Sequence, residues 1–215
     1  MSGKCSARCF PPGYKVIALP DARAAIAYTP DLNITKHVAQ NDRDAAVGVL
    51  STEKGKTLVA SVYCDIQKPF TTLSNVSHLA RELKYPTLIA TDSNAWSELW
   101  GPKENARGRE LEEILIVKEL EIETLKQSIP TFDNGRGSSF IDLTLSRGLS
   151  GLVKDWKVTR SEDSDRNYVW HHLDLVPEVR EIQYWSETDW KRFKEYVKEK
   201  SKKSLPAEGV HDGKH

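Results

Sequence analysis

The sequence predicts a mixed α/β fold in which two β-sheets pack face to face and helices cover their outer faces. Segments with strand-like patterns number about eight, more than the helical ones. Several neighbouring strands are joined by short turns typical of hairpins, and two helical segments interrupt the strands. An excess of strands over helices favours packed sheets rather than a helical bundle.

Two hairpins and a helix are predicted in the first part of the chain. Pro20 separates one pair of apolar runs, and Lys54-Gly55 supplies turn residues for the next pair. A helix follows because apolar residues recur at helical spacing, with Ser74 placed to cap the first turn. The expected ranges are strands over 14–19, 24–29, 46–52 and 57–64, and a helix over 75–84.

A buried strand and a surface helix come next. The run that follows Pro86 is continuously apolar, which predicts a strand covered on both faces. The helix is amphipathic, although Gly108 weakens its first turn. The expected ranges are a strand over 87–91, a helix over 105–118, and strands over 121–126, 140–146, 156–160 and 168–176, split by turns at Asn134-Gly135 and Gly148.

One domain with a tail is the expected organisation of 215 residues. Ser186 and Asp189 form a capping-box arrangement that predicts a short helix. With 39% hydrophobic and 29% charged residues, the chain is neither wholly disordered nor a membrane protein. No apolar run approaches the ~20 residues that span a bilayer, and residues 1–20 lack a signal-peptide pattern. We expect an intracellular protein, nuclear or cytoplasmic, and not a secreted one.

Charge and cysteine content give weak indications. The formal net charge is zero, which by itself does not indicate a nucleic-acid partner. The basic cluster Lys198–Lys203 is interpreted as a solvated tail or, alternatively, a phosphate contact. Cys5 and Cys9 form a lone Cys-x-x-x-Cys pair, a weak zinc signal, and with Cys64 they are better interpreted as free thiols.

Two carboxylates at or inside strands are the first candidates for chemistry. Asp92 and Asn94 follow the buried strand two residues apart, a spacing that places strand side chains on one face. Asp positions a water or protonates a leaving oxygen, and Asn donates to a phosphate oxygen; the alternative is a turn cap. Asp142 lies inside an apolar strand, where an unpaired buried carboxylate is costly. It either pairs with an imidazole or a metal, or it makes a hydrogen bond to a neighbouring loop or faces outward.

The order of several motifs resembles the endonuclease domain of non-LTR retrotransposons, in the endonuclease/exonuclease/phosphatase superfamily. The run from Asp92 to Gly101 reads Asp-x-Asn-Ala-x-Ser-x-x-Trp-Gly; Pro130-Thr131-Phe132 and Ser139-x-Ile-Asp-Leu-Thr follow, and then Ser164-Asp165. The resemblance implies a four-layer α/β sandwich lacking its first strands. It divides the chain into a partial endonuclease/exonuclease/phosphatase-like domain over 10–180, a helical linker over 181–205 toward an absent reverse transcriptase, and a disordered tail over 206–215.

The same resemblance implies a role for each matching residue. Asp92 would position the attacking water or assist the leaving group, and both Asn94 and Tyr63 would contact the substrate phosphate. Asp142 would orient a catalytic histidine, and Asp165 would help to hold a metal, usually magnesium. The implied reaction is hydrolysis of a DNA phosphodiester, with no small-molecule cofactor.

Departures from the family pattern weaken the expectation of activity. Arg166 stands at the catalytic histidine position and cannot cycle a proton near neutral pH. His171 is five residues further along an extended strand, roughly 16 Å away, and cannot replace it in place. Only 13 residues precede Tyr14, and they contain no Glu for the principal metal ligand. Thr91 and Ser93 are milder departures.

Three hypotheses follow. The chain is a truncated endonuclease domain with strongly reduced or absent activity, a repurposed module that binds nucleic acid without cleaving it, or a fragment of an incorrectly predicted gene. The first is favoured here, and the oligomeric state is left open. On this hypothesis, catalytic rescue would need both the N-terminal strands and Arg166→His.

Overall fold

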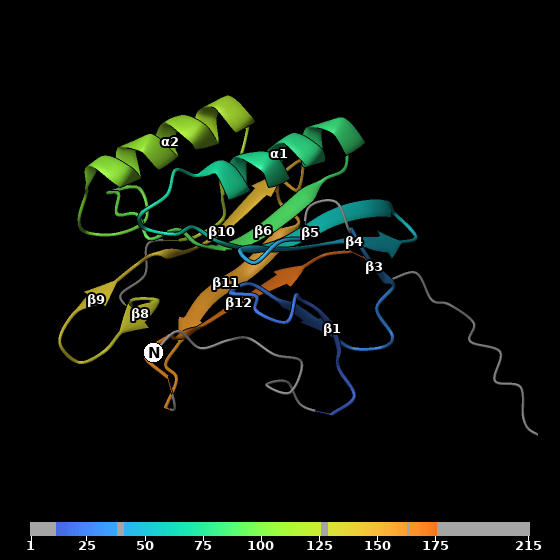
Figure 1. Ribbon diagram of the computed structural model, residues 1–215, viewed down its shortest axis with the longest axis horizontal. Helices are drawn as coiled ribbons and strands as arrows, with labels where there is room; N and C mark the ends of the chain where they lie inside the picture. Colours follow the sequence, from blue (N-terminus) through green and yellow to red (C-terminus); the bar gives the residue numbers. More distant parts are fainter. Residues whose placement is uncertain (1–11, 38–40, 126–128, 163, 176–215) are drawn as a thin grey trace, which may run out of the picture. The chain divides into compact units, whose positions relative to one another are not determined.

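A six-stranded mixed sheet forms the centre of the structure, a computed structural model that describes residues 12–37, 41–125, 129–162 and 164–175 (Figure 1). The strand order is β3-β4-β5-β6-β10-β7, and β5 and β6 are the parallel pair. Its strands are β3 (Ile34–Lys36), β4 (Ala45–Thr52), β5 (Gly55–Tyr63), β6 (Thr87–Asp92), β7 (Glu121–Ile122) and β10 (Asp142–Arg147).

Two helices, α1 (Thr71–Leu83) and α2 (Ala106–Lys118), lie on one face of this sheet. The core lies between them and the sheet and contains fully buried side chains such as Leu58, Ile89 and Leu145. These positions point to one side of their strands because strand side chains alternate between the two faces, so each strand gives its most buried face to the helices.

The N-termini of the helices differ from each other. Asn105 caps α2 by accepting the backbone N–H of Gly108 at 2.7 Å. The prediction that Ser74 caps α1 is wrong, because this helix begins at Thr71 and the N–H of Ser74 already donates to the carbonyl of Phe70. A side chain three residues inside a helix has no free first-turn N–H to accept.

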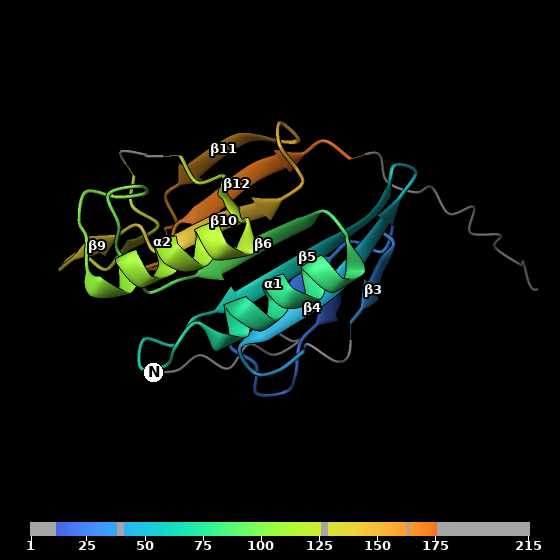
Figure 2. The same cartoon turned by 90° about the horizontal axis from the view of Figure 1, so that it is seen from above.

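A second layer, made of two separate hairpins, lies on the opposite face of the sheet (Figures 1 and 2). The hairpins are β1 (Lys15–Ile17) with β2 (Ile26–Tyr28), and β11 (Val153–Thr159) with β12 (Tyr168–Leu173). The first packs over β4, where Gly48 leaves room for Ile17. The second is joined to β10 by a hydrogen bond of 3.0 Å from the indole N–H of Trp156 to the hydroxyl of Thr144. Ala90, on the central strand β6, is exposed, so the layer is open between the two hairpins.

The expected fold class, a mixed α/β sandwich of packed strand layers and helices, is confirmed. The described residues provide three of the four expected layers, because both described helices lie on the same face of the central sheet. The sequence missed β3 and the short hairpin of β8 (Phe132–Asp133) and β9 (Ser138–Ser139), and β7 is shorter than expected. No described helix has both the length and the apolar character needed to cross a membrane. The helix expected after Ser186, the linker and the tail lie outside the described residues, as do Cys5 and Cys9.

Candidate nucleic-acid site

Three of the predicted residues stand side by side at the ends of adjacent strands. Tyr63 on β5 is the register partner of Asp92 on β6, and Asp92 is the partner of Asp142 on β10. Directly opposed residues in a sheet lie within about 5.5 Å at their Cα atoms. The strand register therefore brings together side chains that are 29 and 50 positions apart in the sequence.

Arg166 joins the two carboxylates. It lies on the loop between β11 and β12, and its Nη1 donates to both oxygens of Asp142, at 2.8 and 3.0 Å. Its Nη2 donates to Oδ2 of Asp92 at 2.7 Å. The guanidinium also lies over the ring of Phe132, with 5.2 Å from its central carbon to the ring centroid. The position that the family resemblance assigns to a catalytic histidine therefore holds a fixed cation.

The sequence left open which group pairs with the carboxylate of Asp142. In the structure that partner is Arg166, an arginine on a loop, rather than an imidazole or a metal. Burial raises the pKa of Asp142 to about 6, the charge of Arg166 lowers it, and the charge of Asp92 adds to the rise. Burial also raises the pKa of Asp92, again opposed by Arg166. Burial disfavours the ionised forms of both acids, and the charge of Arg166 offsets part of this effect.

Asn94 does not share a face with Asp92 in the way that the spacing suggested. The strand β6 ends at Asp92, and Asn94 has a left-handed backbone with φ of 48°. Its side-chain N–H donates to the carbonyl of Cys64 at 3.1 Å, which ties it to the segment after β5. The prediction from strand periodicity is wrong at this point, because the chain turns immediately after the carboxylate.

Asp165 is exposed at the edge of the site, next to Arg166 in the chain. Its backbone carbonyl accepts the N–H of Asp133 at 2.8 Å, and its carboxylate forms no ion pair within the described ranges. Among those same residues, no group of three or more His, Cys, Asp and Glu is placed to hold a metal ion. A magnesium ion prefers several oxygen ligands, whereas here a guanidinium lies between the two half-buried carboxylates. The donor set that the described residues provide does not fit a resident magnesium.

The carboxylates open into a cleft of about 870 Å³ that runs over β5 and β6, between the two hairpins. Arg23 lines it from the β1–β2 side, with its guanidinium 4.3 Å from the ring centroid of Tyr63. Asp44 and Asp65 hold Arg23 in place at 2.6 and 3.0 Å. Arg43 also lines the cleft, is exposed, and has no ion pair in the part of the chain that the structure describes.

Sequence reasoning missed both of these arginines and the placement of His171. Arg23 and Arg43 flank predicted strands, and no local pattern indicates that they face Tyr63. His171 on β12 does line the cleft, where burial lowers its pKa and the carboxylate of Glu123 acts in the opposite direction. Such residues can be identified only from the three-dimensional structure, because their position depends on which hairpin packs beside the strand ends.

The fold and the opposed carboxylates define an α/β sandwich of the endonuclease/exonuclease/phosphatase type. The chain belongs to the endonuclease-reverse transcriptase family, whose model matches residues 57–170, more than half of the chain. In Drosophila melanogaster, the 115 kDa protein of the type-1 retrotransposable element R1DM is 26% identical over 208 residues. The alignment covers 86% of this chain and 20% of that protein, so the chain spans about a fifth of its relative.

Solved structures share the fold. The endonuclease domain of TRAS1, a telomere-specific non-LTR retrotransposon, superimposes with a TM-score of 0.66 and 26% identity, covering 75% of this chain and 80% of that one. The AP endonuclease LMAP from Leishmania major has a TM-score of 0.61 at 11% identity, covering 75% of this chain and 71% of its own. The catalytic domain of Xenopus laevis APE2 has a TM-score of 0.57 at 14% identity, with coverages of 80% and 79%. The two more distant structures support the fold alone.

Proposed function

We propose that this chain is a retrotransposon-type endonuclease domain that binds DNA in the cleft but hydrolyses it weakly or not at all. The observation that carries the proposal is the bridge from Arg166 to Asp92 and Asp142. Family membership and the likeness to the TRAS1 domain support DNA as the ligand. The bridge supports the loss of catalysis.

Loss of hydrolysis follows from the chemistry of a guanidinium. A general acid or base must gain and lose a proton near the working pH. Burial lowers the pKa of Arg166, but the charges of Asp142 and Asp92 outweigh this and raise it above its usual value, so it stays protonated. The Oδ2 atom of Asp92 accepts a hydrogen bond from Arg166, so this oxygen is not free to position a water molecule.

Binding of a phosphate is retained in the same geometry. A guanidinium carries five N–H donors, and Arg166 uses its two terminal nitrogens on carboxylates while 38% of its side chain is exposed. Tyr63 and Arg23 face the cleft from the neighbouring strand end, and Arg43 is unpaired in the described part. Arginine and tyrosine donors are those that proteins use to hold nucleic-acid phosphates. This arrangement favours the non-catalytic binding module as the second candidate for function.

The purified chain is expected to leave supercoiled plasmid intact in magnesium or manganese, at the same level as the Asp92→Ala variant. Gel separation of nicked and supercoiled forms measures this, and circular dichroism confirms that both samples are folded. DNA affinity is measured on the same samples by fluorescence anisotropy at fixed salt. Magnesium-dependent nicking that disappears in Asp92→Ala would establish a working endonuclease and overturn the proposal for Arg166.

The Arg166→His variant alone is expected to stay inactive in the same assay. The change supplies an imidazole next to Asp142, but it adds no carboxylate to a described site that lacks a metal-holding group. Arg136→Ala, in an exposed loop, is the matched control for loss of an arginine. Robust nicking by Arg166→His would show that the missing histidine was the whole defect.

A further inference from the structure

The β11–β12 hairpin carries two exposed aromatic rings on the face that points away from the central sheet. Tyr168 and Trp170 are each 54% exposed, and their ring centroids are 6.2 Å apart. On the opposite face of the hairpin, Trp156 is buried and donates its indole N–H to Thr144 of β10. Because side chains alternate along a strand, the exposed rings and the buried ring belong to opposite faces. The outer face of the hairpin is therefore an aromatic surface in contact with solvent.

The strand register adds basic side chains to the same face, because directly opposed residues of two antiparallel strands lie on one side. We call this face the aromatic platform; its residues are Tyr168, Trp170, His172, Thr159, Lys157 and Lys154. None of these side chains is acidic. Lys157 is opposite Trp170, is exposed, and has no ion pair within the described ranges. Lys154 pairs with Asp174 at 2.7 Å. The platform thus combines aromatic rings with one lysine that is available to an anion.

The ring of Trp170 is held in place although it is exposed. Its indole N–H donates to the hydroxyl of Thr159 on the neighbouring strand at 2.8 Å. Thr159 is the register partner of Tyr168, so this hydrogen bond keeps the indole beside the tyrosine ring. A ring that is already fixed loses little freedom when a ligand stacks on it, which reduces the ordering cost of binding.

The aromatic platform begins at the cleft. Tyr168 belongs to both, because it lines the cleft together with Arg166. Two residues of chain span at most about 7 Å between Cα atoms, so Tyr168 stays within that distance of Arg166. Trp170 is not part of the cleft lining and is the next residue on the same face of β12. A DNA strand that leaves Arg166 along this face meets Tyr168 first and Trp170 second.

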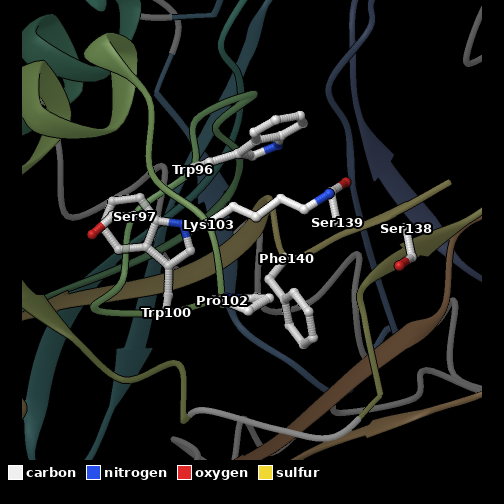
Figure 3. Close-up of a pocket in the computed structure, with 9 residues that line it drawn as sticks. Trp96, Ser97, Trp100, Pro102, Lys103, Ser138, Ser139 and Phe140 are labelled. Atoms are coloured by element: carbon white, nitrogen blue, oxygen red, sulfur yellow. The ribbon is translucent and has the colours of Figure 1, made fainter.

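Trp96, the other exposed tryptophan of the described residues, is not connected to the cleft in this way. It lines a separate pocket of about 70 Å³ together with Lys103 and Phe140 (Figure 3). No residue lines both that pocket and the cleft. Among the described tryptophans, Trp170 is therefore the one that extends an aromatic row from the cleft.

We propose that the aromatic platform binds single-stranded DNA that continues from the cleft. Bases stack on Tyr168 and Trp170, and Lys157 pairs with a backbone phosphate. The inference rests on the proposed DNA binding in the cleft. Bases in a duplex are parallel and already stacked on each other, whereas the two rings are tilted by 50°. Because a paired base must first be unstacked at a cost, the platform binds unpaired DNA more tightly than a closed duplex.

The test measures the fluorescence anisotropy of labelled oligo-dT of about 12 nucleotides, alone and annealed to its complement. The wild-type chain is expected to bind the single strand more tightly than the duplex. Trp170→Ala should weaken binding of the single strand about tenfold, the order of one base–aromatic stack, and leave duplex binding unchanged. Trp170→Phe, which keeps a ring, should retain most of the affinity. Lys157→Ala should lower the salt dependence of single-strand binding by about one phosphate contact.

Tyr14→Ala is the matched control, because this tyrosine is 46% exposed and belongs neither to the cleft lining nor to the platform. It should leave both affinities unchanged. If the wild-type chain binds neither DNA form, the proposed function fails together with the platform. If it binds DNA, and Trp170→Ala binds the single strand as tightly as the wild type, only the platform is wrong. An equal loss on single strand and duplex would show that Trp170 supports the cleft rather than stacking on bases, and would also overturn the inference.

Discussion

Arg166→Ala is expected to lower the free energy of unfolding by about 2 kcal/mol at pH 8 and by much less at pH 5. Removing one partner of a buried ion pair costs roughly 3–5 kcal/mol. The exposed 38% of the Arg166 side chain lets solvent screen the interaction and reduces this figure. Urea unfolding at the two pH values measures the effect, and Arg136→Ala should change neither value by more than ~0.5 kcal/mol.

The sign of the pH dependence comes from the raised pKa values of Asp142 and Asp92. Asp142 has a pKa of about 6 in the folded chain even with Arg166 present, against ~3.9 when unfolded. Loss of the cation raises both values further, so the two carboxyls are neutral and tolerated at low pH. As the pH rises through the pKa of the folded chain, the two carboxyls become charged, and these unpaired charges lower the free energy of unfolding. An additional Asp142→Asn change should restore part of the loss at pH 8. An equal loss at both pH values would contradict this account.

Gly108→Ala is expected to lower the free energy of unfolding by about 3 kcal/mol, or roughly 10 °C in the unfolding midpoint. A Cβ atom at this position would lie 1.7 Å from the carbonyl oxygen of Trp96, a backbone atom that cannot rotate away. Alanine normally favours a helix over glycine by about 1 kcal/mol, so the clash determines the sign. The sequence indicated only a weak first turn here, whereas the structure shows why glycine is required.

Gly137→Ala is the matched control for this change. Nothing lies within 4 Å of the Cβ that it would add, and its backbone is not left-handed. Thermal unfolding followed by circular dichroism should show little change for Gly137→Ala. A Gly108→Ala variant as stable as the wild type would mean that the segment from Trp96 to Asn105 shifts to make room for the added methyl group.

The sequence predicted most long elements because each carries a pattern that does not depend on its neighbours. The strand Thr87–Asp92 carries a continuous apolar run over residues 88–90, and α2 repeats apolar residues at helical spacing. The hairpin of β8 and β9 has two residues in each strand, too few for any periodicity. The turn at Asn134-Gly135 was predicted because Asn and Gly favour turn conformations. The strands on either side were not predicted, because their pairing uses backbone hydrogen bonds that leave no side-chain pattern in the sequence.

The site could be predicted only as far as its residue types. Asp92, Asp142 and Tyr63 are at strand ends, and a buried acid in an apolar strand requires a partner wherever it occurs. Residue patterns alone could not identify the partner, because Arg166 lies 74 positions from Asp92 and its placement depends on the packing of the β11–β12 hairpin. Only the family resemblance, which puts Arg166 at the histidine position beside Asp142, indicated it. Asn94 was misplaced for a local reason, its left-handed backbone.

The loop that carries Arg166 belongs to a two-stranded hairpin, and such a hairpin is marginally stable on its own. Trp156 attaches it to β10 through Thr144, whereas Asp92 and Asp142 belong to the six-stranded sheet. The cation and the two acids thus belong to two separately hydrogen-bonded sheets. A substitution that loosens the hairpin, such as loss of the Trp156–Thr144 hydrogen bond, would therefore also withdraw the guanidinium from both carboxylates. The charge balance of the site depends on how the hairpin packs as well as on the sheet that carries the acids.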